Sequence, residues 1–321
     1  MSKCAKIWLV IAASLVLVGV AVLGGIMTVL KWDFSKLSTN KYETNEYEIS
    51  QEFKSIFVDT DTSDVVFAVS ESNEYSVVCY EQKNIKHLVE VKDDTLVIKL
   101  VDARKWYEYI GINFDSPRIS VNIPSGEYEG LSVKLSTGDL EVPKELSFKT
   151  IDIRSSTGDI TSAASASDAI KVKTTTGSIT LEGASAGSLD LSVTTGKVTV
   201  SDVICEGDVI VCTSTGKAHL SNIKCKNLTS IGDTGDITIR EVIATGKFSI
   251  ERDTGDVRFE RCDASEIFAF TDTGDVEGSL LTDKVFITKS DTGDVRVPSS
   301  ISGGRCEITT DTGDIEFVIV S

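Results

Sequence analysis

A Thr-Gly pair recurs every 19 or 20 residues through the second half of this chain. So constant a spacing requires each copy to be one structural unit packed against the next, because a unit this short cannot bury an apolar face alone. The period also leaves no room for a helix beside strands and turns. The glycines of the ten pairs are Gly138, Gly158, Gly177, Gly196, Gly216, Gly235, Gly255, Gly274, Gly293 and Gly313.

Apolar and polar residues alternate on both sides of each pair, as at Leu189 and Leu191 before Gly196. Period-two alternation of β-branched and other apolar residues is typical of half-buried strands, and Thr-Gly-Asp between two strands is typical of a tight turn. The pattern predicts an all-β chain that folds as a β-solenoid (β-helix) of about ten rungs. At ~4.8 Å per rung the rod would be on the order of 45–50 Å long.

The repeats also divide the chain into segments. Asp61 to Val65 resembles a degenerate repeat turn, so we expect the irregular strands before the repeats to continue the solenoid and cap it. The aromatic segment 104–114 interrupts this cap and either covers the first rung or forms a binding edge. The predicted segments are a short head (1–6), a transmembrane anchor (7–30), a polar linker (31–45), the irregular cap (46–124) and the repeat solenoid (125–321).

Residues 7–30 are 24 consecutive residues without a charge, flanked by Lys6 and Lys31. A helix of about 20 residues spans the hydrocarbon core of a bilayer. Signal-peptide cores are shorter, about 7–15 residues, so an uncleaved single-pass anchor is favoured over a signal cut after Ala21. The six-residue head favours a cell-membrane protein with its C-terminal domain outside the cytoplasm.

Acidic residues outnumber basic ones, 49 to 32, for a formal charge of −17. This excess argues against nucleic acid as a partner, because phosphate binding requires Lys and Arg. Residues 32–321 alone carry 29 basic and 49 acidic residues, so this part should be repelled by anionic lipid. Contact with the membrane is therefore expected through the N-terminal helix alone.

From Gly235 onward each turn reads Asp-Thr-Gly-Asp, which predicts two columns of stacked carboxylates. Like charges about 5 Å apart repel each other, and Ca²⁺ could relieve that repulsion. The alternative is that each Asp accepts backbone N–H bonds in its own turn and points into water. The candidate metal ligands are Asp233, Asp253, Asp272, Asp291 and Asp311 in one column and Asp236, Asp256, Asp275, Asp294 and Asp314 in the other. No other cofactor is predicted.

Two classes of enzyme share parts of this pattern. Aspartic proteases use Asp-Thr-Gly, but their two carboxylates converge across a cleft, whereas a repeat stacks its copies in a line. Polysaccharide-active β-helices need a particular acid–base pair, and here the carboxylates recur in every rung. We therefore predict no catalytic residues, with a polysaccharide-active enzyme as a remote alternative.

Several single residues carry smaller expectations. Neither His87 nor His219 has a companion at metal-ligand spacing in the sequence. Cys205 and Cys225 lie one repeat apart, so they should stack as neighbours, either as thiols or as a disulfide. Three residues that are not apolar occupy inward positions in the repeats of Gly235 and Gly255, where we expect the register or the core to be irregular: Ser230, Gly232 and Arg252.

The arrangement resembles a bacterial family of unknown function whose members are described as candidate adhesins, related to adhesin-head domains. The resemblance rests on an N-terminal apolar segment, the run Ile119-Ser120-Val121-Asn122-Ile123-Pro124, and serial Thr-Gly-Asp turns over residues 46–321. It implies an accessory membrane protein of an envelope-stress system, whereas the apolar span and the repetitive rod without a catalytic pair predict a non-catalytic β-solenoid that binds an envelope or protein partner. Alternatives are a structural spacer or an accessory protein of an envelope-stress system.

Overall fold

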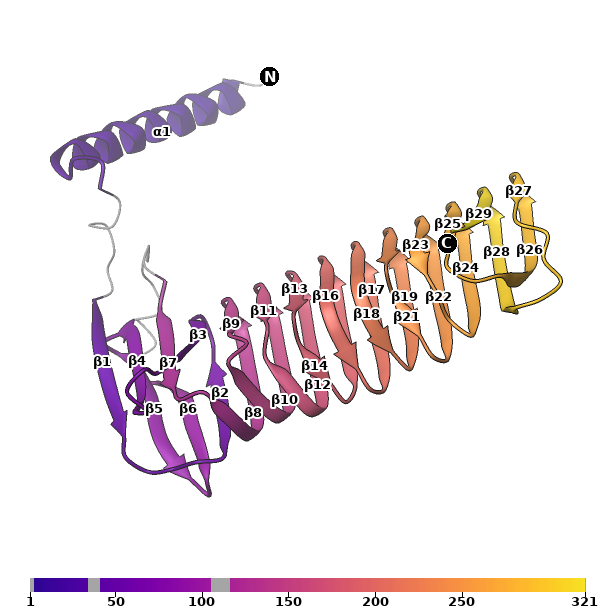
Figure 1. Cartoon of the computed structure of the whole chain (residues 1–321). Coiled ribbons are helices and arrows are strands. Elements are labelled where there is room, and N and C mark those ends of the chain that lie inside the picture. Colours follow the sequence, from indigo (N-terminus) through magenta and orange to yellow (C-terminus); the bar gives the residue numbers. More distant parts are fainter. Residues whose placement is uncertain (1–2, 34–40, 105–115, 321) are drawn as a thin grey trace.

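The computed structural model describes residues 3–33, 41–104 and 116–320, and within them the chain forms one helix and 29 strands. The β-solenoid predicted from the repeats is confirmed, as a long rod of stacked rungs (Figure 1). Apart from Arg104, the aromatic segment 104–114 lies outside the described residues.

Helix α1 (Lys3–Val29) lies apart from the strands (Figure 1). Its 25-residue stretch Ala5–Val29 contains an 18-residue window with a mean hydropathy of 2.7, none of which is buried by protein. A core helix of a soluble domain would be covered by other elements. This helix is long and apolar enough to cross a membrane, as an anchor or a signal sequence.

The strands before the repeats form two small sheets, which are the cap. In one, β1 pairs with β4 and β4 with β7, both antiparallel, and β7 then pairs with β3. In the other, β5 pairs antiparallel with β6, which pairs with β2. The strands are β1 (Tyr42–Ile49), β2 (Ser55–Thr60), β3 (Asp64–Val69), β4 (Tyr75–Gln82), β5 (Ile85–Lys92), β6 (Thr95–Asp102) and β7 (Arg118–Ile123).

Strands β2 and β3 join this cap to the first rung, because β2 pairs with β8 and β3 with β9. The turn between β2 and β3 is the one that the sequence marked as a degenerate repeat turn, and that interpretation is confirmed. Strand β1 begins at Tyr42, earlier than the expected end of the linker at residue 45.

Each rung has a strand before the turn glycine and another after it. The strands before the glycine are β8 (Gly126–Thr137), β10 (Leu146–Thr157), β12 (Ser165–Thr176), β15 (Leu189–Thr195), β17 (Asp208–Thr215), β19 (Asn227–Thr234), β22 (Lys247–Thr254), β24 (Glu266–Thr273), β26 (Lys284–Thr292) and β28 (Gly304–Thr312). Those after it are β9 (Leu140–Val142), β11 (Ile160–Ser162), β13 (Ile179–Glu182), β16 (Val198–Cys205), β18 (Ala218–Cys225), β20 (Ile237–Arg240), β23 (Val257–Cys262), β25 (Val276–Leu280), β27 (Val295–Arg296) and β29 (Ile315–Ile319), with two short third strands, β14 (Ser185–Ala186) and β21 (Ile243–Ala244).

A second corner lies within each middle rung's second strand or directly after it. There a single residue has a left-handed backbone, which turns the chain without a hydrogen-bonded hairpin. The equivalent residues are Gly183, Asp202, Asn222, Glu241 and Arg261, with φ from 49° to 68°. Four of these five are not glycine, so the sequence carries no glycine signal for this corner.

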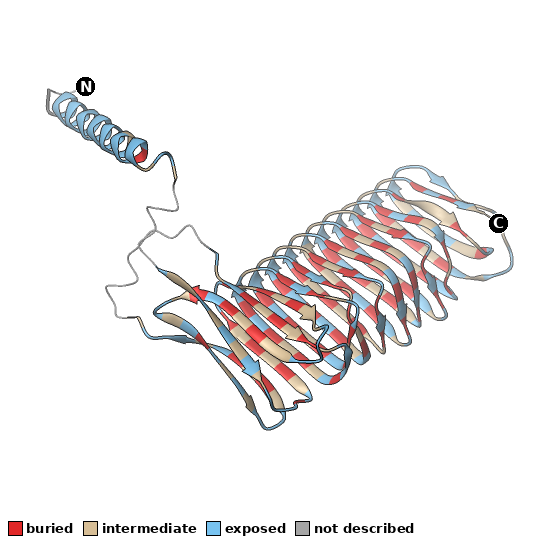
Figure 2. Cartoon of the chain, turned by 60° about the vertical axis from the view of Figure 1, so that its left-hand side comes forward, coloured by how far each residue is buried: buried red, intermediate tan, exposed pale blue. Residues whose placement is uncertain are grey.

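The core is a continuous column of inward side chains, visible as alternating buried residues along each strand (Figure 2). Aromatic rings pack against one another within it near both ends, for example the tilted pairs Tyr128–Phe148 and Phe259–Phe317, with ring centroids 5.8 Å apart in each. The central rungs are irregular in composition but not in register, since β19 and β22 pair without a shift. There the fully buried Arg252 donates to Ser230 and lies against Gly232.

The last two rungs are stacked in the reverse of their sequence order. Strand β24 pairs with β28, and β26 pairs only with β28, so the final rung lies between its two predecessors (Figure 1). Strands β25, β29 and β27 follow the same order. The expectation that each repeat packs on the next in sequence is therefore wrong at this end. The rung of β26 and β27 closes the rod.

Candidate functional site

The Thr-Gly-Asp corner runs along the whole rod and holds the residues singled out by the sequence. Its glycines have φ between 128° and 153°. A Cβ on Gly216, for example, would overlap the carbonyl oxygen of Gly196 in the preceding rung. The backbone continues its ladder through the corner, because the N–H of Gly196 donates to the carbonyl of Thr215 at 2.9 Å. Only glycine fits this close approach.

The residue directly after each glycine forms the first carboxylate column. Where it is Asp, its Oδ1 accepts the backbone N–H of the corresponding residue in the next rung, as Asp256 does from Asp275 at 2.9 Å. The sequence offered a backbone role of this kind as the alternative to Ca²⁺, but with the donor in the same turn, whereas the donor lies in the next rung. The column is Asp64, Asp139, Asp159, Ser178, Lys197, Lys217, Asp236, Asp256, Asp275, Asp314 and Asp294 in spatial order.

This column has two acidic runs, of which the sequence analysis identified one. The N-terminal run begins in the cap, where Asp64 accepts the N–H of Asp139 at 3.0 Å. Lysines separate the runs, and the hydrogen bond from Lys217 lowers the pKa of Asp236 from its ordinary value. The signal for the first run was present, because Thr-Gly-Asp also occurs in the two earliest repeats.

The residue two positions before each glycine forms the second column, which is exposed to solvent. Its first five members carry hydroxyls and its last five carry carboxylates. Asp291 pairs with Lys289 at 2.8 Å. The other four carboxylates have no hydrogen bond or ion pair with any residue in the described ranges: Asp233, Asp253, Asp272 and Asp311. Because of the reversed rungs, Asp311 lies next to Asp272 and Asp291 is outermost.

A groove of about 440 Å³ crosses five rungs on another side of the rod. It is lined by Ser147, Ser165 and Ser185 and by the apolar Phe148, Ala166 and Ala186, with Glu127 and Glu206 at its two ends. Hydroxyls beside small apolar surfaces suit hydrogen-bonding ligands with apolar faces.

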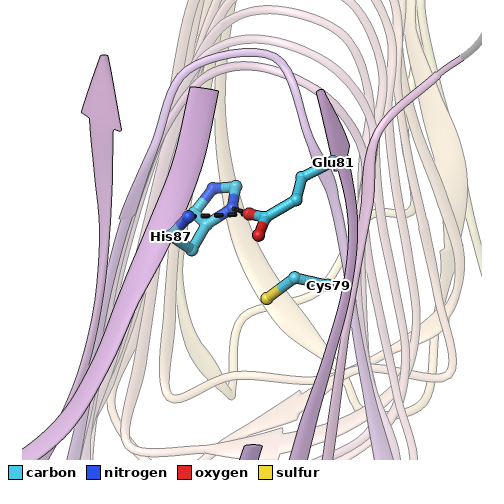
Figure 3. A group of neighbouring side chains, drawn as sticks. All are labelled: Cys79, Glu81 and His87. Atoms are coloured by element: carbon cyan, nitrogen blue, oxygen red, sulfur yellow. Dashed lines mark hydrogen bonds and ion pairs between the residues drawn. The ribbon is translucent and has the colours of Figure 1, made fainter. Parts of the chain in front are cut away.

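The cap holds a buried cluster that the sequence analysis missed. One ligand-type atom each from Cys79, Glu81 and His87 lies within 4.8 Å of the other two (Figure 3). The expectation that His87 has no metal-ligand companion is therefore wrong. Glu81 and His87 lie on β4 and β5, which belong to different sheets of the cap, so their approach follows from tertiary packing.

Hydrogen bonds connect this cluster to both sheets. The Oε2 of Glu81 is 2.7 Å from Nδ1 of His87 and also accepts the His87 backbone N–H at 2.7 Å. Asn45 on β1 donates to Glu81 Oε1 at 2.7 Å, and Thr60 on β2 lies 2.9 Å from His87 Nε2. Burial raises the pKa of the Cys79 thiol to about 12, so the thiol is protonated unless a cation displaces its proton.

The remaining described cysteines are free thiols. Cys205 and Cys225 stack in neighbouring rungs, as the thiol alternative expects, and burial raises the pKa of Cys225 to about 12.

The family model described as Toastrack DUF4097 matches residues 53–211 and 196–321, which together cover most of the chain. The chain belongs to the DUF4097 toastrack family. Among curated proteins none matches it. This match confirms the resemblance to a family of unknown function with serial Thr-Gly-Asp turns.

Several solved structures are similar to this toastrack protein. A candidate adhesin from Bacteroides fragilis is 18% identical, with 87% of this chain and 97% of that chain covered and a TM-score of 0.45. A candidate lipid-binding protein from Parabacteroides distasonis is 15% identical, with coverages of 88% and 98% and a TM-score of 0.49. A candidate cell-adhesion protein from Clostridium sporogenes is 10% identical, with coverages of 88% and 100% and a TM-score of 0.25. At these values the similarities carry no argument about a ligand.

Proposed function

We propose that this toastrack protein is a membrane-anchored, extracytoplasmic, non-catalytic binding rod for a component of the cell envelope, in the manner of an adhesin. One observation carries the proposal. The residues of the corner columns and of the groove come from equivalent outward positions of successive rungs, so the surface repeats along the rod. A ligand with its own linear repeat can make equivalent contacts along such a surface, and many weak contacts then add to a useful affinity.

The groove is the surface that best fits such a ligand. It crosses successive rungs, so its long direction follows the rod. Sugar units offer hydroxyls and apolar ring faces, which match the serines and the small apolar residues that line it. We therefore propose an envelope polysaccharide as the partner class.

A binding assay tests this proposal. The full chain in detergent is incubated with cell-wall glycans immobilised on beads, and retention is measured. Ser185→Arg, which fills the groove, should abolish retention, whereas Ser249→Arg, on an outward position of β22, should not. Retention unaffected by Ser185→Arg would exclude the groove, and hydrolysis of the glycan would overturn the non-catalytic proposal.

If the protein is only a structural spacer, neither the parent nor the Ser249→Arg variant should be retained on any envelope component. The proposed location has its own test: protease added to intact, wall-stripped cells should digest residues 41–321 and leave the helix. Full protection of the domain while the membrane is intact would refute an extracytoplasmic domain.

A further inference from the structure

The cluster in the cap joins two sheets that have no strand pairing with each other at this point. Cys79 and Glu81 project inward from β4, and His87 projects from β5 on the opposite sheet (Figure 3). The three residues are 0%, 1% and 3% exposed. Glu81 and His87 form the polar link across this end of the cap, at 2.7 Å.

The hydrogen bonds around His87 leave two arrangements of its ring. If Thr60 donates to Nε2, then Nδ1 carries a proton and donates it to Glu81. If Nε2 donates to Thr60, then a lone pair on Nδ1 faces a carboxylate oxygen at 2.7 Å, and a cation must lie between them. A second proton is the cation that fits this distance. A metal ion can take its place once the two atoms move apart to make room for Zn–N and Zn–O bonds of about 2.0–2.2 Å.

The thiol of Cys79 provides an independent observation. It points toward Glu81 and His87 and makes no hydrogen bond with the described residues (Figure 3). The buried thiols of Cys205 and Cys262 donate to backbone carbonyls at 3.6 and 3.1 Å, whereas those of Cys225 and Cys306 make no hydrogen bond with the described residues and, unlike Cys79, have no imidazole and carboxylate beside them. Cys79 is therefore a polarisable group with no protein partner, aimed at an imidazole and a carboxylate.

We propose that Cys79, Glu81 and His87 bind one divalent transition-metal ion of the zinc type, which links the two sheets of the cap. Thiolate, imidazole and carboxylate are the ligands that Zn²⁺ takes in proteins. The ion would replace the thiol proton and any proton between Nδ1 and Oε2, and these leave as solvent protons. Thiolate and carboxylate carry two negative charges, which a divalent ion neutralises within the core.

The surrounding residues fit this role. Thr60 would accept the Nε2–H of His87 and hold the ring with Nδ1 toward the ion, while Asn45 orients the carboxylate through Oε1. Since the ligands are almost completely buried, no substrate can reach the ion. The site would therefore be structural and would hold together the end of the cap.

Metal content tests this proposal on the full chain. The protein is produced in cells grown with Zn²⁺, or with Co²⁺ as a spectroscopic substitute, so that the ion is present while the chain folds. Each purified chain should contain about one ion, and the Co²⁺ form should show thiolate-to-metal charge-transfer absorption. Both signals should disappear in Cys79→Ser and in His87→Gln. They should remain in Cys306→Ser, a buried thiol in the last rung of the sequence.

The ligand variants could lose metal because they fail to fold, so a variant that keeps all three ligands is also needed. Thr60→Val keeps all three ligands but removes the acceptor for His87 Nε2, so metal affinity should fall about 10–100-fold. Absence of bound metal from the folded parent would overturn the proposal and leave a hydrogen-bonded Glu–His pair. Charge-transfer absorption that persists in Cys79→Ser, or an affinity that Thr60→Val does not change, would overturn it as well.

Discussion

The two halves of the solenoid share one corner backbone but present different chemistry on it. In the first five rungs the exposed position two residues before the glycine holds Ser136, Ser156, Thr175, Thr194 and Ser214. In the last five rungs it holds only Asp. Both halves use the same glycine contacts and the same backbone ladder through the turn. The backbone contacts therefore determine the turn, and the side chain at this position can vary without changing it.

The halves also differ in how the rungs are ordered. The first eight repeats stack in sequence order, whereas the last repeat inserts between its two predecessors. Because the last repeat lies between two other rungs, the apolar residues of β28 and β29 are buried, and the less buried strands β26 and β27 form the end of the rod. The final rung should therefore contribute most to the stability of the C-terminal half.

Removal of residues 304–321 should give the largest effect. It would delete the buried Ile308, Ile315 and Phe317, each worth roughly 1.5–3 kcal/mol of burial. It would also separate β26 from its only partner strand. In hydrogen exchange, amides from β24 onward should lose protection while those of the first rungs keep it, because each rung contacts only its neighbours. Loss of protection along the whole rod would contradict this local description.

Glycine substitutions test whether the two halves have the same turn. A Cβ on Gly158 would overlap the carbonyl oxygen of Gly138, and one on Gly274 that of Gly255. Gly158→Ala and Gly274→Ala should each destabilise the protein by roughly 3 kcal/mol or more, since backbone must move. Gly183→Ala, at a left-handed residue with open space around it, should cost only about 1 kcal/mol. Denaturant unfolding measures all three, and unequal effects at Gly158 and Gly274 would show that the turns differ.

Arg252 lies in the middle of the rod, where the inward columns hold polar residues. It is fully buried, has no carboxylate partner within the described residues, and its Nε lacks a hydrogen-bond acceptor. Desolvation lowers its pKa to about 10. Arg252→Leu should therefore be about 1–3 kcal/mol more stable than the parent at neutral pH. Arg240→Leu, at an exposed arginine, is the control.

The pH dependence of unfolding has a defined sign for this arginine. Because its folded-state pKa is lowered, the unfolded chain holds more protons above about pH 10, and the free energy of unfolding should rise with pH from there toward the ordinary pKa of arginine. Arg252→Leu should lack this rise. If Arg252→Leu instead loses stability strongly, the guanidinium has a partner such as a buried anion.

How far the sequence predicts this structure depends on the kind of contact. Inward positions such as Leu189, Leu191 and Val198 were predictable, because alternation fixes which side chains face the core. The reversed rungs were not, because Phe286 in β26 and Cys306 in β28 occupy equivalent inward positions and either order continues the pattern. The metal-type cluster was not predictable for a different reason.

That cluster depends on which strands face each other across the cap. Glu81 and His87 are close in sequence, but β4 and β5 separate into two sheets after a short turn. Local alternation shows that Cys79 and Glu81 share one face, and it does not show that His87 points at them from the opposite sheet. Sheet assignment is a tertiary property, and irregular strand spacing in the cap gives no repeat from which to infer it.

The smallest predicted effect concerns the carboxylates that distinguish the C-terminal half. Asp253, Asp256, Asp272 and Asp275 replaced together by Asn should give a protein at least as stable as the parent at low ionic strength. Asn retains an oxygen that accepts the backbone N–H, and repulsion between stacked carboxylates is removed. The melting temperature should rise by a few degrees at most, and added salt should remove the difference by screening.

The effect of Ca²⁺ on the melting temperature tests whether the two carboxylate columns are also a metal site. Non-specific screening by Ca²⁺ would raise the melting temperature of the parent no more than Mg²⁺ does at the same concentration. A Ca²⁺ ladder would give a larger rise with Ca²⁺ than with Mg²⁺, since a ligand that binds only the native state stabilises it by mass action. That excess should vanish in the Asn variant and persist when the hydroxyls of Ser156, Thr175 and Thr194 are replaced by Ala. Equal responses to the two ions would leave Asp256 and Asp275 with their backbone role alone and Asp253 and Asp272 as solvated side chains.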